Sequence, residues 1–226
     1  TQVRGMNVAI RNANDAISLS QTAEGSLSKI NDMGQRMREL AVQSANATNS
    51  DSDRKNLDAE YQALAQEIKR NLAGASFNGT KLFAAAAALT FQVGANAATT
   101  DQITIKTENL AGENSIVEVI GAAGADAASI GTAAGASAAL GKLDTMLATV
   151  NAKRAEFGAT QNRFEAVIQT LQVSAENQTA ARSRIMDADF ASETASLTRA
   201  QVLQQAGTAM LSQANSLPNN VLSLLR

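Results

Sequence analysis

The stretch MNVAIRNANDAISLSQTAEGSLSKINDMGQRMREL, residues 6–40, decides the fold. Its apolar and small residues recur at spacings of three and four, and this spacing already holds at Val3 and continues to Ser44. Such spacing places the side chains on one face of an α-helix, over a length closer to a coiled-coil seam than to an ordinary globular helix. We therefore predict a long amphipathic helix over residues 1–46, and we expect it to begin upstream of residue 1. Its seam positions are Val3, Met6, Ile10, Ala13, Ile17, Ser20, Ala23, Leu27, Ile30, Met33, Met37, Leu40 and Ser44.

A polar break separates this helix from a second one. The residues SANATNSDSD, 44–53, are rich in Asn, Ser, Thr and Asp, which end helices and cap new ones. The helical spacing then resumes and ends near Gly74, which predicts a second helix over residues 53–73. Two helices joined by a short polar loop form an antiparallel hairpin. The second seam consists of Leu57, Tyr61, Leu64, Ile68 and Leu72.

The pattern changes after residue 75. FNGTKLF, residues 77–83, contains an Asn-Gly turn, while LTFQVGA and DQITIKT alternate as strands do, so we predict a small β-hairpin region over residues 76–120. The alanine run 84–88 between them suits neither a turn nor a strand, and we assign it no function. Residues 121–137 are rich in glycine and alanine, which is typical of a linker or a weakly ordered surface segment.

Two further helices are expected in the last part of the chain. The first, over residues 138–178, has the seam Leu140, Leu143, Leu147, Val150, Arg154, Phe157, Gln161, Phe164, Ile168, Leu171 and Ala175, in which two polar residues could fix the register. The second lies in residues 181–226 and carries Leu197, Ala200, Leu203, Ala206, Met210, Ala214, Leu217, Val221 and Leu224 on one face. No other part of the sequence is left to cover that face, although most helical stability in proteins comes from such burial.

These elements predict a mainly α fold, a coiled-coil-like bundle of long helices with a small β-hairpin region. We expect residues 1–75 to form the first part of a helical core domain and 76–120 its β-hairpin region. Residues 121–137 form the variable segment, 138–180 the returning core helix, and 181–226 a linker and a final helix.

Composition excludes several classes of function. The 226 residues carry a formal net charge of -2, so there is no basic surface for nucleic acid, and no apolar stretch is long enough to span a membrane. Cysteine and histidine are absent, which removes thiol chemistry and the commonest general base and metal ligand. The carboxylates of Glu39, Asp187 and Asp189 lie in helical or capping contexts, so we predict neither an enzyme nor a metal or cofactor site.

Three stretches carry a family resemblance. GMNVAIRNANDAISLSQTAEG, QRMRELAVQSANATNSDSDR and ARSRIMDADFASETASLTRAQVLQQAGTAMLSQANSLPNNVLSLLR closely resemble bacterial flagellin, the subunit of the flagellar filament. The resemblance implies that the helices at 1–46, 53–73 and 138–178 form a rod-like core domain, and that residues 188–226 belong to the innermost domain of the filament. In flagellins an N-terminal helix, which would precede residue 1 here, pairs with that last segment. The short middle implies little or no outer domain.

The resemblance implies a structural function rather than an enzymatic one. We expect a subunit that is exported by the flagellar type III pathway without a cleaved signal and assembles into an extracellular filament for motility. One alternative is a hook-filament junction protein, although AQVLQQAG and the ending VLSLLR favour filament flagellin. Another is a flagellin-like cell-surface protein that binds glycans, which the 3% aromatic content supports little.

Partners and contact residues also follow from the resemblance. It implies other flagellin subunits, an export chaperone, and the filament cap and junction proteins, with no nucleic acid and no membrane. The residues expected to mediate assembly and chaperone binding are Leu203, Met210, Leu217, Val221, Leu222, Leu224 and Leu225. The resemblance also implies contact with Toll-like receptor 5 through Arg36, Leu40, Gln43 and Glu60. The residues alone favour a simpler interpretation, a polar helix face with one exposed leucine.

Overall fold

The computed structural model describes residues 1–122, 124–187 and 189–223, with side chains as far as Ala214. The chain divides into two units, Thr1–Glu176 and Asn177–Arg226, which we call the bundle unit and the C-terminal unit. Each unit is described by itself below.

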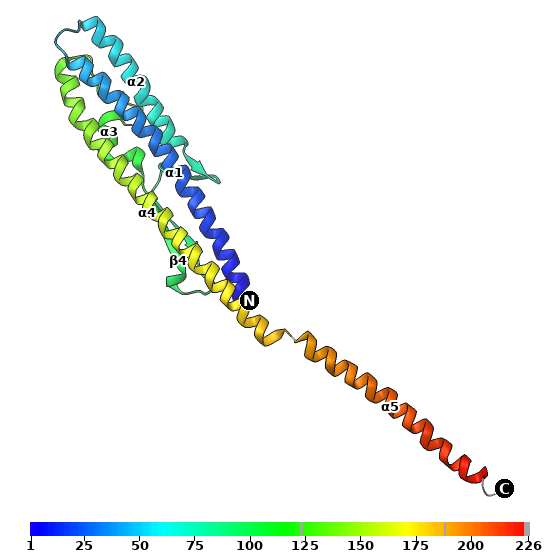
Figure 1. Ribbon diagram of the computed structural model, residues 1–226. Helices are drawn as coiled ribbons and strands as arrows, with labels where there is room; N and C mark the ends of the chain where they lie inside the picture. Colours follow the sequence, from blue (N-terminus) through cyan, green and yellow to red (C-terminus); the bar gives the residue numbers. More distant parts are fainter. Residues whose placement is uncertain (123, 188, 224–226) are drawn as a thin grey trace. The chain divides into compact units, whose positions relative to one another are not determined.

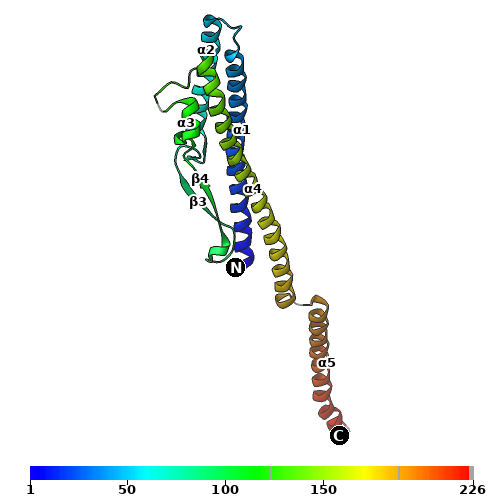
Figure 2. The ribbon, with the colours of Figure 1, turned by 90° about the vertical axis from the view of Figure 1, so that its left-hand side faces the viewer.

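Long helices dominate the bundle unit (Figure 1). Helix α1 spans Gln2–Ala45, α2 spans Asp51–Gly74, and α4 spans Ala133–Met186, of which the part up to Glu176 belongs to this unit. The three helices run side by side in both views (Figure 2). The mainly α prediction is therefore confirmed, and α1 and α2 lie within a few residues of their predicted bounds.

Two short antiparallel hairpins follow α2. Strands β1 (Ser76–Phe77) and β2 (Thr80–Lys81) pair around a turn in which Asn78 has φ 47° and Gly79 has φ 80°. Only a turn of this hand accommodates two positive φ angles, and Asn-Gly is the sequence that favours it. Strands β3 (Ala87–Gln92) and β4 (Gln102–Thr107) pair with Leu89 opposite Ile105, and the short helix η1 (Thr99–Asp101) lies between them.

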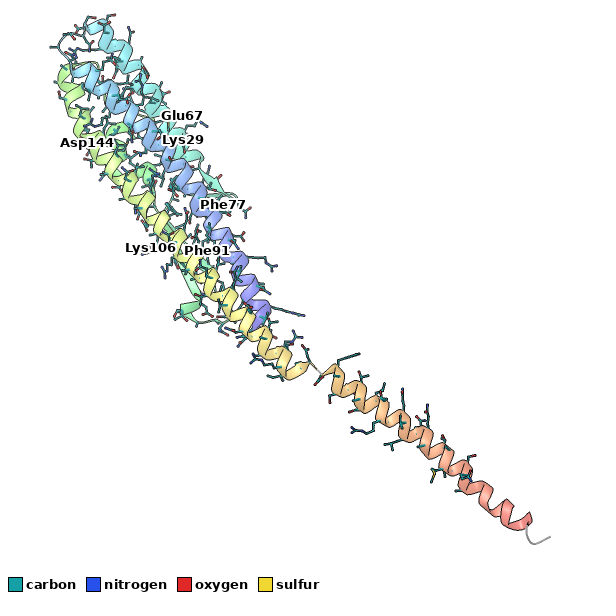
Figure 3. The ribbon with its side chains drawn as sticks, viewed as in Figure 1. Lys29, Glu67, Phe77, Phe91, Lys106 and Asp144 are labelled. Carbon is teal, nitrogen blue, oxygen red and sulfur yellow. The ribbon has the colours of Figure 1, made fainter. Side chains whose placement is uncertain are left out.

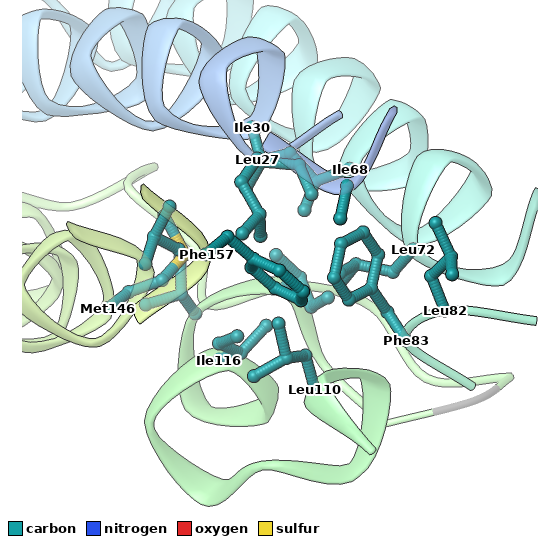
Figure 4. Close-up of a cluster of buried hydrophobic side chains, with 14 of the residues drawn as sticks. Leu27, Ile30, Ile68, Leu72, Leu82, Phe83, Leu110, Ile116, Met146 and Phe157 are labelled. Carbon is teal, nitrogen blue, oxygen red and sulfur yellow. The ribbon is translucent and has the colours of Figure 1, made fainter. Parts of the chain in front are cut away.

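Part of the core of the bundle unit is a cluster where the three long helices meet Phe83, Leu110 and Ile116 (Figure 4). Leu27 and Ile30 come from α1, Ile68 from α2 and Phe157 from α4, and all four are buried. The rings of Phe83 and Phe157 meet edge to face, with centroids 6.4 Å apart. Every predicted seam position of α1 is buried or half-buried, and the same holds for the seam of α4. Periodicity thus identified which faces of these helices enter the core.

One element departs from the predicted β region. Residues Asn114–Ile120 form a helix, α3, after the short helix η2 (Leu110–Gly112), within the range assigned to strands. Ile116, Val119 and Ile120 are buried on one side of α3, at the three-and-four spacing of a helix. The stretch is too short for periodicity to separate helix from strand. The alanine run also differs from expectation, because Ala87 and Ala88 begin β3.

The glycine- and alanine-rich segment is more ordered than a linker. Gln62 of α2 pairs with both backbone groups of Ala127, accepting from its N–H at 3.0 Å and donating to its carbonyl at 3.4 Å. Asp58 accepts the N–H of Ile130 at 2.7 Å, and Lys69 donates to the carbonyls of Ala122 and Ala125. Side chains of α2 thus hydrogen-bond to the backbone N–H and carbonyl groups of this segment. From Ala133 onward the segment belongs to α4, so the predicted start of that helix at 138 was too late.

The C-terminal unit consists of helix throughout most of its described residues. The end of α4 reaches Met186, and α5 spans Phe190–Ser223. Asp189 caps α5, because its Oδ1 accepts the N–H groups of Ala191 at 3.0 Å and Ser192 at 3.3 Å. The predicted division between residues 180 and 181 lies inside α4, whereas the two units divide between Glu176 and Asn177.

Candidate functional site

Helix α5 presents the most extensive apolar surface of the described chain. Phe190 is 85% exposed, Leu203 65% and Met210 71%, and Leu197, Val202 and Leu211 are also exposed. Large apolar side chains in contact with water are unfavourable, and a contiguous patch of them marks an interaction surface. We call these six residues the α5 stripe.

Two of the predicted assembly residues belong to the α5 stripe, Leu203 and Met210. The side chains of Leu217, Val221 and Leu222, and the whole of Leu224 and Leu225, lie outside the described residues. Phe190, Val202 and Leu211 were missed by sequence reasoning. These three residues could have been predicted from the sequence, because they are large apolar residues next to the predicted seam in a segment with few charges.

The α5 stripe differs chemically from the surfaces of the other helices. Glu193 and Arg199 are the only charged residues between Phe190 and Ser223, and the remaining polar side chains are hydroxyls and amides. Such a helix has little charge with which to select a partner or a register. Its interactions must therefore depend on apolar burial and on close packing at small residues.

The second predicted site lies on α1 and α2. Arg36 Nη2 is 2.8 Å from Glu60 Oε1, and Arg36 Nη1 is 3.1 Å from Glu39 Oε2, with all three side chains well exposed. The hydrogen bonds that Arg36 donates to Glu60 and to Glu39, in that order of importance, raise the pKa of Arg36 above its ordinary value. Gln43 is exposed one turn beyond Glu39. The structure thus brings Arg36 and Glu60 together from two helices.

Leu40 departs from expectation at this site. It is 1% exposed and belongs to the core, so the predicted exposed leucine of this face is wrong. The physical reason is that Leu40 continues the buried seam of α1, one turn after Met37 and one before Ser44. The apolar residue that this face does expose is Val42, at 50%.

The three carboxylates that were expected in helical or capping contexts make structural contacts. Glu39 pairs with Arg36, Asp189 caps α5, and Asp187 accepts a hydrogen bond from Ser183. No group of three or more His, Asp or Glu that could hold a metal ion occurs among the described residues. Within the same residues, no helix is both long and apolar enough to cross a bilayer.

Comparison with known proteins agrees with this architecture. The family model of the bacterial flagellin N-terminal helical region matches residues 1–88, and that of the bacterial flagellin C-terminal helical region matches residues 140–225. The chain is 40% identical over its whole length to flagellin of Halalkalibacterium halodurans, covering 80% of that protein.

The chain belongs to the bacterial flagellin family.

Other relatives place it within the same family. It is 38% identical to flagellin of Bacillus subtilis and 39% identical to the flagellar filament 31.3 kDa core protein of Treponema maltophilum. In each case all of the chain is matched, and it covers 82% of the relative. Flagellins are structural proteins.

Solved structures share the fold. The crystal structure of Bacillus cereus flagellin matches with a TM-score of 0.60 at 30% identity, over 76% of this chain and 94% of the other. A structure described as a flagellar hook-associated protein from Vibrio parahaemolyticus matches with a TM-score of 0.61 at 13% identity, over 79% of this chain and 92% of the other. The second likeness shows the fold alone. The long-helix architecture therefore also occurs in a hook-associated protein. Sequence identity, rather than the fold, distinguishes flagellins from that protein.

Proposed function

We propose that this chain is a structural subunit of a bacterial flagellar filament that serves motility, and that α5 is the segment through which copies assemble. The observation that carries this proposal is the α5 stripe, which lies within the matched C-terminal flagellin region and is exposed in a single copy. A filament made of many copies would bury such stripes against one another. The relatives named as flagellin and as a filament core protein support a filament rather than a soluble binding protein.

Assembly by purified protein tests the role of α5. In the full-length protein, Leu203→Asp and Met210→Asp should abolish filaments in negative-stain electron microscopy, because a buried unpaired carboxylate is strongly unfavourable. The matched control is Gln201→Asp. Two residues span roughly 200° of an α-helix, so residue 201 faces away from Leu203. Filaments of normal width from Leu203→Asp would rule out the proposed role, whereas failure of all three variants would show only a general intolerance to charge.

The hook-filament junction role remains the alternative within this fold. The likeness to a hook-associated protein is at 13% identity and extends to the fold only, whereas flagellins match at about 40% over the whole chain. Self-assembly separates the two roles, because a filament subunit grows long fibres from itself alone. A glycan-binding surface protein has no supporting observation on the described surface.

Export to the extracellular flagellum through the flagellar type III pathway is part of the same proposal. Before assembly the α5 stripe would need a cover in the cytosol, and an export chaperone could bind it as an apolar helix in a groove. Copurification of the chain with that chaperone, and its loss in Leu203→Asp but not in Gln201→Asp, is the expected result. The filament cap and junction proteins are the further partners that a filament subunit requires.

Recognition by Toll-like receptor 5 through Arg36, Gln43 and Glu60 is a second proposal. The exposed Arg36–Glu60 pair supports it, because arginine is enriched among the residues that dominate binding. Leu40 is too deeply buried to touch a partner. Purified monomer should activate receptor-bearing cells, and Arg36→Ala should reduce the response while Lys29→Ala, another exposed cation of α1, should not. A silent wild-type monomer would reject the proposal.

A further inference from the structure

The bundle unit contains a hollow between the β3–β4 hairpin and α4. It measures about 300 Å³, and its walls include Val93 and Ile103 from the hairpin and Val167 and Leu171 from α4. Val93 and Ile103 are each only 5% exposed, so they form the floor. Phe91, which Figure 3 labels beside α4, meets Phe164 edge to face at 5.8 Å and fixes the hairpin against that helix.

This hollow differs from the depressions that lie on single helices. The depression on α5 is lined by residues 190–203 and the one on α1 by residues 35–43, so each is the open side of a single helix. The hollow at the hairpin instead joins residues 93–103 to residues 163–171, which only the tertiary fold brings together. A concave site formed between separate elements, apolar within and polar at the rim, is the usual form of a small-molecule site.

Arg163 gives the hollow its chemical preference. It is the only charged residue of the lining, and it makes no ion pair with any described residue. Of the other polar residues of the lining, Thr170 donates to the carbonyl of Ala166 at 3.0 Å, Gln102 donates to Gln92 at 3.1 Å, and Thr100 carries a neutral hydroxyl. The guanidinium therefore remains the strongest free donor at the mouth, and its planar fork suits a carboxylate.

We propose that this hollow binds a small amphipathic carboxylate. The apolar tail would lie between the hairpin and α4 on Val93, Ile103 and Val167, while the carboxylate pairs with Arg163. Charge complementarity with Arg163 selects an anion over an alcohol or an amine, and the volume limits the ligand to a short tail. This binding activity is independent of filament assembly and of the α5 stripe.

Octanoate is the probe for this site, with octan-1-ol and octylammonium as matched ligands of other charge. In the full chain with methyl-labelled Val, Leu and Ile, octanoate should shift the resonances of Val93, Ile103, Val167 and Leu171 in a saturable manner. Octan-1-ol and octylammonium should bind at least about tenfold more weakly, since a charge-assisted hydrogen bond is lost. All titrations stay below the concentrations at which the probes self-associate.

Two variants and one control separate specific from general binding. Arg163→Gln should weaken octanoate at least about tenfold, and Leu171→Glu should abolish its binding by placing a like charge in the hollow. Arg11→Gln, which removes another exposed arginine, on α1, should change nothing. Equal binding of all three probes, or unaltered octanoate binding by Arg163→Gln, would overturn the proposal. So would the absence of octanoate binding together with an assembly defect in Arg163→Gln, which would instead make this groove a contact between subunits.

Discussion

Helices α4 and α5 have the same type of sequence pattern and opposite environments. In the bundle part of α4 the seam residues Leu143, Val150 and Phe164 are fully buried, whereas Leu203 and Met210 of α5 are mostly exposed. A three-and-four spacing therefore identifies the face of a helix that needs a partner, but it does not supply that partner. In α4 the partner is the rest of the same unit. In α5 the proposal assigns it to other copies.

Charge is the second difference between the two regions. The seam between α1 and α4 is flanked by ion pairs, with Arg38 Nε 2.7 Å from Asp144 Oδ1 and Arg154 Nη2 3.8 Å from Glu24 Oε1. Such pairs penalise wrong registers, because a slipped helix would face uncompensated charge. The described part of α5 has only Glu193 and Arg199. The ion pairs of the bundle thus favour a single register of its helices. The described part of α5 has few charges that could specify a register, so its packing depends on a partner with a complementary apolar surface.

The largest expected effect tests the buried side of this comparison. Phe164→Ala should destabilise the bundle unit by about 3–5 kcal/mol, because it removes a fully buried ring and its contact with Phe91. Urea denaturation followed by circular dichroism measures it. Leu203→Ala, the matched change in α5, should leave the main transition unchanged. An equal loss in both variants would mean that α5 is part of the same cooperative unit.

The next effect compares two glycines. Gly121 has φ 78°, and a Cβ there would lie 2.1 Å from the carbonyl oxygen of Asp126, so Gly121→Ala should cost about 1–3 kcal/mol in the bundle unit. At Gly207 of α5 a Cβ meets nothing within 4 Å. Gly207→Ala should therefore favour helix formation by about 0.5–1 kcal/mol. Thermal unfolding should show the loss at Gly121, and the far-ultraviolet signal should show the gain at Gly207. A stable Gly121→Ala protein would contradict the close packing at this turn.

A smaller effect compares the caps of α2 and α5. Ser50 accepts the N–H of Asp53 at 3.2 Å, and the Asp53 carboxylate accepts the N–H of Ser50 at 3.1 Å, which is a complete capping box. Ser50→Ala should cost about 1 kcal/mol in the main unfolding transition. Asp189→Ala removes the cap of α5 and should lower helix content without moving that transition. Ser50→Gly serves as the control, since glycine is tolerated at this position and should cost less.

The smallest effect concerns the ion pair between α1 and α4. The hydrogen bond from Arg38 holds the pKa of Asp144 below its ordinary value. A carboxyl whose folded pKa is lowered stabilises the fold above its unfolded pKa of about 3.9, and this stabilisation is lost as the pH falls through the folded value. Both side chains are about half exposed, so the effect should be small and reduced by salt.

The measurement is the difference in urea midpoint between wild type and Asp144→Asn as a function of pH. The difference should be present at neutral pH and should disappear in acid. Lys142→Gln, on the same helix, is the control. A difference that persists below the folded pKa of Asp144 would show that the substitution acts through packing rather than charge.

Several elements were predictable because a local rule fixes them. The seam of α1 follows from periodicity, the β1–β2 turn from Asn78-Gly79, and the start of α2 from the cap at Ser50. The exposure of an apolar face on α5 was also predictable, since no other part of the sequence was left to cover that face. Three of its residues, Leu197, Leu203 and Met210, were identified from spacing alone.

Other features depended on contacts that no local pattern contains. Residues 121–137 resemble a flexible linker by composition, yet Asp58, Gln62 and Lys69 of α2 bind the backbone of Ile130, Ala127 and Ala125. The receptor-contact motif predicted an exposed Leu40, but the position of Leu40 in the seam of α1 buries it. The hollow beside Arg163 joins segments far apart in the chain and has no sequence signature.

The sequence by itself determined which residues form helices, which face of each helix needs cover, and the family to which the chain is related. These follow from the short-range geometry of the backbone, in which spacing alone places side chains on a face. Only the tertiary structure decided that the glycine-rich segment is ordered, that Arg36 meets Glu60, and that Arg163 stands over an apolar hollow. The physical reason is that each of these depends on groups distant in sequence, whose approach is set by how the helices pack rather than by any residue's neighbours in the chain.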